Sequence, residues 1–234
     1  MLYLDIFIKI MKIDFDKYPY PKKIRHHTSS NLYFPIKDLK IVPSYYPPLY
    51  DDIDISKYFG NSKSPDILDI GCGKSKFLLA YSEQFPNRNI LGIELRKGLV
   101  DWAQNYILNE GIKNAWVIWY SAVNGLKFIQ DNSIAEVFYL FPDPWPKLKQ
   151  QNRRLFSIEF LNELYRIIEH SGKLYISTDC DYVDEYHLKI LKKSGLFDYE
   201  ISSNKEWKYP RTNKEEFCIK NNIPIYRIEA IPKK

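Results

Sequence analysis

Apolar residues recur along this chain in two patterns, which follow one another regularly from residue 65 onward. Short apolar runs indicate strands, at 66–70, 89–94, 115–120, 134–140 and 173–177, with a later alternating one at 225–231. Longer segments of helical periodicity indicate helices, at 74–84, 97–109, 154–169 and 181–194, with a short one near 124–130. Strands that alternate with helices of about 10 to 15 residues favour βαβ units and a parallel sheet.

The first 60 residues lack this regularity. They include a basic run, Lys22-Lys23-Ile24-Arg25-His26-His27, which we interpret as solvated surface, with contact to a polyanion as the alternative. The apolar stretch 1–11 is too short to span a bilayer and carries Asp5 and Lys9, so we expect a packed or frayed extension rather than a targeting signal. We therefore divide the chain into an irregular basic extension, residues 1–60, and an α/β domain, residues 61–234.

The composition of the chain indicates the kind of protein and its cellular location, but it says little about the reaction. The 234 residues are 45% hydrophobic, enough for a sizeable core, and the net charge of +5 permits a polyanionic partner without establishing one. The cysteines, Cys72, Cys180 and Cys218, are far apart and lack metal-ligand spacing. We expect no metal site, no membrane segment and a cytoplasmic location.

A glycine turn, Gly71-Cys72-Gly73, joins the first predicted strand to the first predicted helix. Glycines allow a tight turn and close approach of the backbone to a ligand. Asp69 precedes the turn, and Glu94 ends the next strand, where an acid can bind a ribose diol. A dinucleotide fingerprint would place a third glycine where Lys76 stands, which disfavours an NAD-linked oxidoreductase.

S-adenosylmethionine suits this turn better than a dinucleotide, because it has no phosphate and presents a ribose, an adenine and a charged methionine end. Asp69 and Glu94 match those groups, and the adenine would lie near Ser121 and Ala122, after the third strand. Residues 66–202 therefore look like a class I methyltransferase core. We expect an α/β, Rossmann-like fold with a mostly parallel seven-stranded sheet and helices on both faces.

A proline-rich run, Phe141-Pro142-Asp143-Pro144-Trp145-Pro146, follows the strand predicted at 134–140. Each proline fixes its φ angle and removes a donor, so the turn should be rigid. It would hold Asp143 and Trp145 at the carboxyl end of a strand, where open α/β sheets bind ligands. An acid beside an aromatic ring suits a flat, hydrogen-bonding nucleobase, and the alternative is a stiff structural turn.

This run, with Lys147 and Arg153-Arg154 after it, resembles the signature of the bacterial-type tRNA (guanine-N7-)-methyltransferases. Other segments match in order, over residues 64–232: Asp69–Gly73, Leu91–Glu94, Ser177–Asp179, Thr212–Glu216 and Ile225–Ala230. The resemblance implies methyl transfer from S-adenosylmethionine to N7 of a guanosine in the tRNA variable loop. It also implies action without an obligate protein partner, as a monomer or a homodimer.

By the same resemblance, the cofactor residues would be Asp69, Gly71, Gly73, Glu94, Ser121 and Ala122. Asp143 would be the catalytic acid. The substrate would be bound by Lys147, Asp179 and Thr212 through Glu215. Two positions depart from the family pattern: Ser121 replaces an acid or amide, so its adenine contact could be backbone only, and Asn222 replaces a glycine. Residues 1–60 match poorly.

Guanine N7 carries an in-plane lone pair, so no base must deprotonate it, and alignment should supply most of the rate. The ring becomes cationic as the methyl arrives, and carboxylates at Asp143, Asp179 and Glu215 would stabilise that charge. An acid can also accept from guanine N1 and its amine, a donor pair that adenine lacks. The basic residues Lys147, Lys149, Arg153 and Arg154 are interpreted as phosphate contacts, or as a solvated helix start.

Several alternatives remain open from the residues themselves. Asp179 could cap the helix predicted at 181–194, Thr212 and Glu215 could lie in a solvated loop, and Trp145 could stack on a base or pack under its turn. At the level of function, the alternatives are an adenine-amine methyltransferase and a catalytically silent RNA-binding module. The first usually has a proline and then an aromatic after its acid-proline pair, the reverse of Trp145-Pro146.

Overall fold

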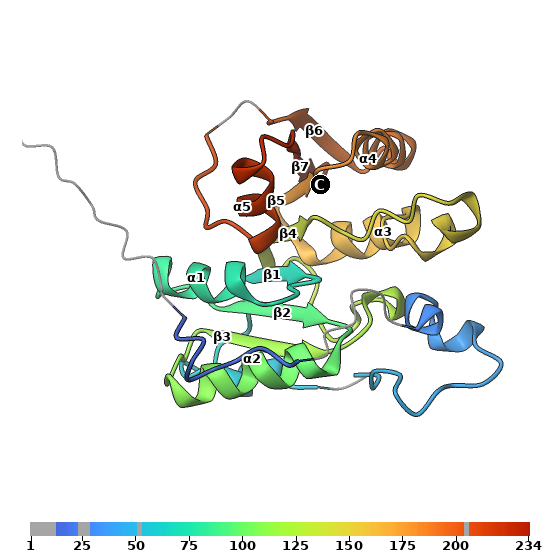
Figure 1. Cartoon of the computed structure of the whole chain (residues 1–234). Coiled ribbons are helices and arrows are strands. Elements are labelled where there is room, and N and C mark those ends of the chain that lie inside the picture. The colour runs from blue at the N-terminus through green and yellow to red at the C-terminus, as the bar shows by residue number, and fades with distance from the viewer. Residues whose placement is uncertain (1–12, 23–28, 51–52, 204–205) are drawn as a thin grey trace, which may run out of the picture.

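A twisted sheet in the order β3-β2-β1-β4-β5-β7-β6 runs through the middle of the molecule (Figure 1). The computed structural model describes residues 13–22, 29–50, 53–203 and 206–234. Within them the strands are β1 (Ile67–Ile70), β2 (Ile90–Glu94), β3 (Ala115–Trp119), β4 (Ile134–Leu140), β5 (Ile168–Thr178), β6 (Phe197–Ile201) and β7 (Tyr226–Pro232). The first five strands pair in parallel, and β7 pairs antiparallel with both β5 and β6.

Helices cover both faces of this sheet. They are α1 (Lys76–Gln84), α2 (Lys97–Asn109), α3 (Ile158–Ile167), α4 (Asp181–Ser194) and α5 (Asn213–Lys220). One apolar cluster joins α1 and α2 to Ile67 and Phe138, and the other joins α3 and α4 to Leu68 and Val137. Neighbouring residues of one strand thus enter opposite clusters, as expected of parallel strands buried on both faces. The expected Rossmann-like α/β fold is confirmed.

The close approach of α1 to the sheet depends on Gly92 in β2. A Cβ atom at this position would lie 2.5 Å from Cδ1 of Leu78 and 2.8 Å from Sγ of Cys72. Real Cβ contacts are essentially never that short, so any larger residue here would force the Leu78 and Cys72 side chains to shift. Gly92 is paired in register with Asp69 of β1, so this close packing lies beside the strand that leads into the glycine turn.

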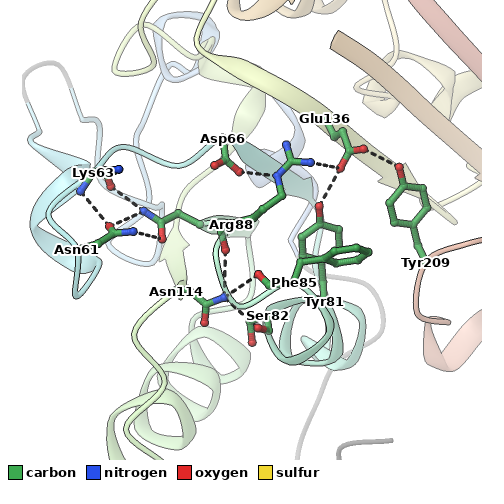
Figure 2. A network of polar contacts seen from close by, with 11 residues as sticks. Asn61, Lys63, Asp66, Tyr81, Ser82, Phe85, Arg88, Asn114, Glu136 and Tyr209 are labelled. Atoms are coloured by element: carbon green, nitrogen blue, oxygen red, sulfur yellow. Dashed lines mark hydrogen bonds and ion pairs between the residues drawn. The ribbon is translucent and has the colours of Figure 1, made fainter. Parts of the chain in front are cut away.

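A polar network closes the sheet edge at which strands β1 to β4 begin (Figure 2). Arg88 Nε donates to Asp66 Oδ1 over 3.2 Å, and Glu136 accepts from the hydroxyls of Tyr81 (2.8 Å) and Tyr209 (2.6 Å). The Asn114 side chain donates to the carbonyls of Ser82, Phe85 and Arg88. This network ties together the segments at which the four strands begin. Open α/β sheets bind their ligands at the other end, where the strands finish.

Several sequence predictions need correction. The helix expected at 154–169 begins only at Ile158, where Ser157 accepts from the Phe160 amide as its cap, and it ends at Ile167. The short helix near 124–130 is wrong: a 3-10 turn, η4 (Ala122–Asn124), stands there and stops at Gly125, whose φ is +87°. Strand β6 and helix α5 were not predicted.

In the described parts of the amino-terminal extension, the regular elements are three 3-10 helices: η1 (Ser30–Tyr33), η2 (Ile36–Asp38) and η3 (Ile55–Tyr58). Its first described part packs on α2, where the Tyr20 and Trp102 rings lie 4.4 Å apart. The helices η1 and η2, blue in Figure 1, lie beyond the ends of β2 and β3.

Two features of the extension lie outside the described residues: the apolar stretch 1–11, and residues 23–27 of the basic run. Within the described ranges, no helix has the length and apolar character needed to cross a membrane.

Candidate active site

A cavity opens where strands β1 to β4 end, and segments from six parts of the chain line it. They contribute Gly71 after β1, Glu94 and Arg96 around the end of β2, Ser121 and Ala122 after β3, Asp143 and Trp145 after β4, Arg153 and Arg154 further along, and Tyr33 from η1. The structure therefore brings most of the predicted cofactor residues and the predicted catalytic acid to one site. Arg96 and Tyr33 were not predicted.

Asp69 lies just behind this cavity, in β1, and only 3% of its surface is exposed. Its Oδ2 atom is buried and has no hydrogen-bond partner among the described residues. Burial, and then the nearby charge of Glu94, raise the pKa of Asp69 to about 8. A donor or a cation bound in the cavity would supply the partner that this carboxyl lacks.

Glu94 is also buried, at 4% exposure, and it is fully engaged. One oxygen accepts from the backbone amide (2.9 Å) and Nε (2.8 Å) of Arg96, and the other accepts from the Gly73 amide (2.9 Å) and Arg96 Nη2 (3.1 Å). These four contacts fill the lone-pair positions of a carboxylate. Arg96 therefore stands where another donor pair would bind. The sequence signal that could have identified Arg96 is its position two residues after Glu94.

Backbone conformation explains the two glycines of the turn. Gly71 and Gly73 have φ angles of 79° and 57°, in the left-handed region that side chains disfavour. That conformation is what points the Gly73 amide at Glu94. The turn thus ties the end of β1 to the end of β2.

Ser121 is buried beyond the end of β3, and its hydroxyl donates to the Leu32 carbonyl over 2.9 Å. The side chain is thus used within the protein, on a residue of the amino-terminal extension. A ligand beside Ser121 and Ala122 would meet mainly backbone, which agrees with the departure noted at this position.

The proline-rich turn after β4 is strained as well as rigid. Phe141 and Trp145, on either side of Asp143, have φ angles of 50° and 42°, which are uncommon for aromatic residues. The Phe141 amide donates to the Ser177 carbonyl of β5 over 2.7 Å, which anchors the start of the turn. Trp145 is buried at 6% exposure, so it packs under the turn, whereas Asp143 is exposed.

The basic residues after this turn have different surroundings. Arg154 donates to the carbonyls of Pro144 (3.1 Å) and Trp145 (3.2 Å), and its guanidinium lies 4.6 Å from the Tyr186 ring centroid. Arg153 lies over the Trp145 ring at 5.0 Å. Lys147 and Lys149 are exposed. The arginines support the turn, and the lysines face solvent.

The remaining predicted substrate residues gather around α5 and do not line the cavity. Thr212 caps this helix by accepting from the Glu215 amide over 2.9 Å, and Lys214 pairs with Asp179 at 2.6 Å. Glu215 is 2% exposed and pairs with Arg227 at 2.6 Å. The solvated-loop alternative is therefore wrong for Thr212 and Glu215.

Asp179 does not cap α4 either, because Cys180 stands at that position and the cap has no side-chain hydrogen bond. Asn222, after α5, has a φ of 53° and so adopts a conformation typical of the glycine that it replaces.

Comparisons with known proteins identify the family and the fold of this chain. Residues 63–227 match the model of a family described as "Putative methyltransferase". A tRNA (guanine-N(7)-)-methyltransferase of Oceanobacillus iheyensis is 30% identical, over 73% of this chain and 82% of its own. One of Prochlorococcus marinus is 33% identical, over 74% of this chain and 87% of its own. Among solved structures, the 16S rRNA methyltransferase KamB superimposes with a TM-score of 0.54 at 15% identity, over 76% of this chain and 91% of its own, a likeness of fold.

Proposed function

Because the chain belongs to the tRNA (guanine-N7-)-methyltransferase family, we propose that it transfers a methyl group from S-adenosylmethionine to N7 of a guanosine in tRNA, within the variable loop. The observation that carries the proposal is the position of Asp143. Its rigid turn forms one wall of the cavity whose other walls hold the glycine turn and Glu94. Asp143, the acid proposed to bind the nucleobase, and Glu94, the acid proposed to bind the cofactor ribose, thus line the same cavity.

The residues at this cavity fit the cofactor. Asp69 has a buried oxygen without a partner, and Glu94 lies where an acid binds a ribose diol. Gly71 and Gly73 add no side chain of their own to the turn, and Ser121 and Ala122 offer backbone to an adenine. For the ribose to reach Glu94, the Arg96 side chain must move away, since it occupies the acceptor positions of that carboxylate.

Asp143 selects and polarises the base. Its carboxylate accepts from N1 and the exocyclic amine of guanine, and its charge stabilises the cationic ring that forms. When bound, the cofactor supplies an electrophilic methyl, whose carbon–sulfur bond breaks as N7 forms its bond, so the positive charge passes to guanine. No proton moves in this step, and Asp143 works by position and charge.

The tRNA is held by the residues around the turn and α5. Lys147 is exposed and binds phosphate. Arg153 stacks on Trp145 and Arg154 binds the carbonyls of the turn, so the two arginines hold the turn that contacts the RNA. Asp179 supplies a second acid for the guanosine once Lys214 exchanges it for a phosphate, and Thr212 and Glu215 hold α5 in place beside it, as its cap and as its buried ion pair with Arg227. The protein acts in the cytoplasm without an obligate protein partner, as a monomer or a homodimer.

The decisive experiment combines purified protein, methyl-labelled S-adenosylmethionine and an unmodified tRNA transcript, followed by digestion to nucleosides. We expect label in 7-methylguanosine, and none with Asp143→Ala. Asp198→Ala is the matched control, because this acid is exposed on β6, and it should leave the label unchanged. Label in methyladenosine would overturn the base assignment, and no label despite cofactor binding would favour an RNA-binding module.

A further inference from the structure

Residues 29–46 of the amino-terminal extension lie beside the active-site cavity, and Tyr33 of this segment lines it. Leu32 is buried at 5% exposure, and its carbonyl accepts from the Ser121 hydroxyl. The Ile36 amide donates to Asn124 Oδ1 over 2.8 Å, and the Tyr46 hydroxyl donates to the Phe34 carbonyl over 2.7 Å. These bonds fix the segment on the loop that follows β3, and not on the turn that carries Asp143.

Tyr33 bridges from this segment to that turn. Its hydroxyl donates to Oδ2 of Asp143 over 2.9 Å, and its ring meets the edge of Trp145 with centroids 4.8 Å apart at 79°. The two residues joined by the hydrogen bond are 110 positions apart in the sequence. Tyr33 also lines the cavity, so it meets the acid on the side where a ligand would bind.

Asp143 needs such support, because the backbone alone does not orient its carboxylate. The turn fixes the φ angles of its neighbours, but the side chain is exposed and free to rotate about its own bonds. A donor at Oδ2 selects one orientation and leaves Oδ1 for a base. Phosphate binding is an inferior explanation for Tyr33, since its hydroxyl already faces an anion.

We propose that Tyr33 is a positioning residue, which holds the Asp143 carboxylate in the orientation that accepts from the substrate guanine. This inference rests on the proposed function, and it assigns a role to a residue outside the family match at 63–227. The substrate side of the site is then completed by the amino-terminal extension, which lies outside the segment that matches the family model.

The test compares Tyr33→Phe with the wild-type protein in steady-state methylation of a tRNA transcript. The variant keeps the ring and loses only the hydroxyl. We expect kcat to fall about tenfold, the effect of one hydrogen bond to a charged group. The KM for tRNA should change by less than kcat, because phosphate contacts supply most of the affinity for RNA. The Kd for S-adenosylhomocysteine should stay within about twofold, since the proposed contacts of Asp143 are to the guanine and not to the cofactor.

Tyr45→Phe is the matched control. Tyr45 lies in the same segment, its hydroxyl donates to Ser29 Oγ over 2.9 Å, and it does not line the cavity. Its kcat should equal that of the wild type, and thermal unfolding should place all three proteins at the same Tm. Tyr33→Ala should be at least as slow as Tyr33→Phe.

Two results would overturn the inference. An unchanged kcat for Tyr33→Phe would show that the hydroxyl does nothing for turnover. A raised KM with an unchanged kcat would make Tyr33 an RNA-binding residue instead. If the wild-type protein formed no 7-methylguanosine, the proposed function would fail first, and the role of Tyr33 with it, so the two failures are distinguishable.

Discussion

The guanidinium of Arg227, in β7, and the carboxylate of Glu215, in α5, form a buried ion pair with Nη2 and Oε1 2.6 Å apart. The two side chains are 11% and 2% exposed, and the Arg227 guanidinium also lies 5.0 Å from the Trp207 ring centroid. Burial raises the pKa of Glu215, and Arg227 opposes that rise. The pair anchors the helix that carries the predicted substrate residues to the sheet.

Removing one partner of this pair should destabilise the protein. We expect Arg227→Met to lower the free energy of unfolding by about 3–5 kcal/mol, because it leaves the buried Glu215 charge with only the exposed Arg211, 3.9 Å away, as an ion-pair partner. Urea denaturation measures this effect. The double variant Arg227→Met/Glu215→Leu removes both charges and should recover most of the loss. A single variant as stable as the wild type would show that Glu215 is neutral or solvated there.

Asp69 should make stability depend on pH. Its pKa is about 8 in the folded protein, above the value of 3.8 expected when unfolded, so between these values the folded state binds one proton more. The stabilisation is fully present below about pH 4 and is lost as the pH rises to about 8. Asp69→Asn lacks the titrating group and is the control. We expect the wild type to lose stability relative to this variant over that range, as measured by urea denaturation without cofactor.

Glu94 and Arg96 should differ in their effects on cofactor binding. Glu94→Gln removes a charged acceptor for the ribose, so we expect the Kd for S-adenosylmethionine to rise at least about tenfold. Arg96→Met removes only the group that holds Glu94 in the free protein, and the Kd should change less than about threefold. Isothermal titration calorimetry gives both values. An equal loss in the two variants would place Arg96 in the binding site itself.

Arg154 should matter for turnover and not for RNA affinity. Lysine cannot reproduce the two hydrogen bonds to the turn carbonyls together with the stacking on Tyr186, so Arg154→Lys should lower kcat about tenfold or more. The salt dependence of tRNA binding should stay the same. Lys149→Ala is the comparison. Loss of this exposed lysine should reduce the slope of log K against log salt concentration by about one phosphate contact. If Arg154→Lys lowers that slope, the arginine binds phosphate directly.

The sequence was sufficient to predict the centre of the sheet and part of the site. Strands β1 and β2 are completely buried, so their residues are almost all apolar and the acids Asp69 and Glu94 stand out in them. Strand β6 was missed because it lies at the sheet edge and buries only Phe197. Helix α5 was missed for a similar reason, since only Glu215 and Cys218 are buried in it.

The partners of the site residues were the least predictable part. Tyr33 reaches Asp143 across 110 residues of sequence, and no local pattern marks that contact. The hydrogen bond from Ser121 to the Leu32 carbonyl likewise depends on tertiary packing, whereas the contact of Arg96 with Glu94 is local in sequence. A sequence identifies which groups could bind a ligand, but their orientation and their competing partners follow only from the fold.

The position of β7 also bears on how the protein is made. This strand, Tyr226–Pro232, pairs with both β5 and β6, which precede it along the chain. During synthesis the strands β1 to β5 emerge first and can pair with each other, while β6 has no neighbour until β7 leaves the ribosome. The nucleoside half of the site can thus form on a growing chain. The half that holds α5 must wait until β7 has emerged, because β7 supplies the only strand that pairs with β6 among the described residues.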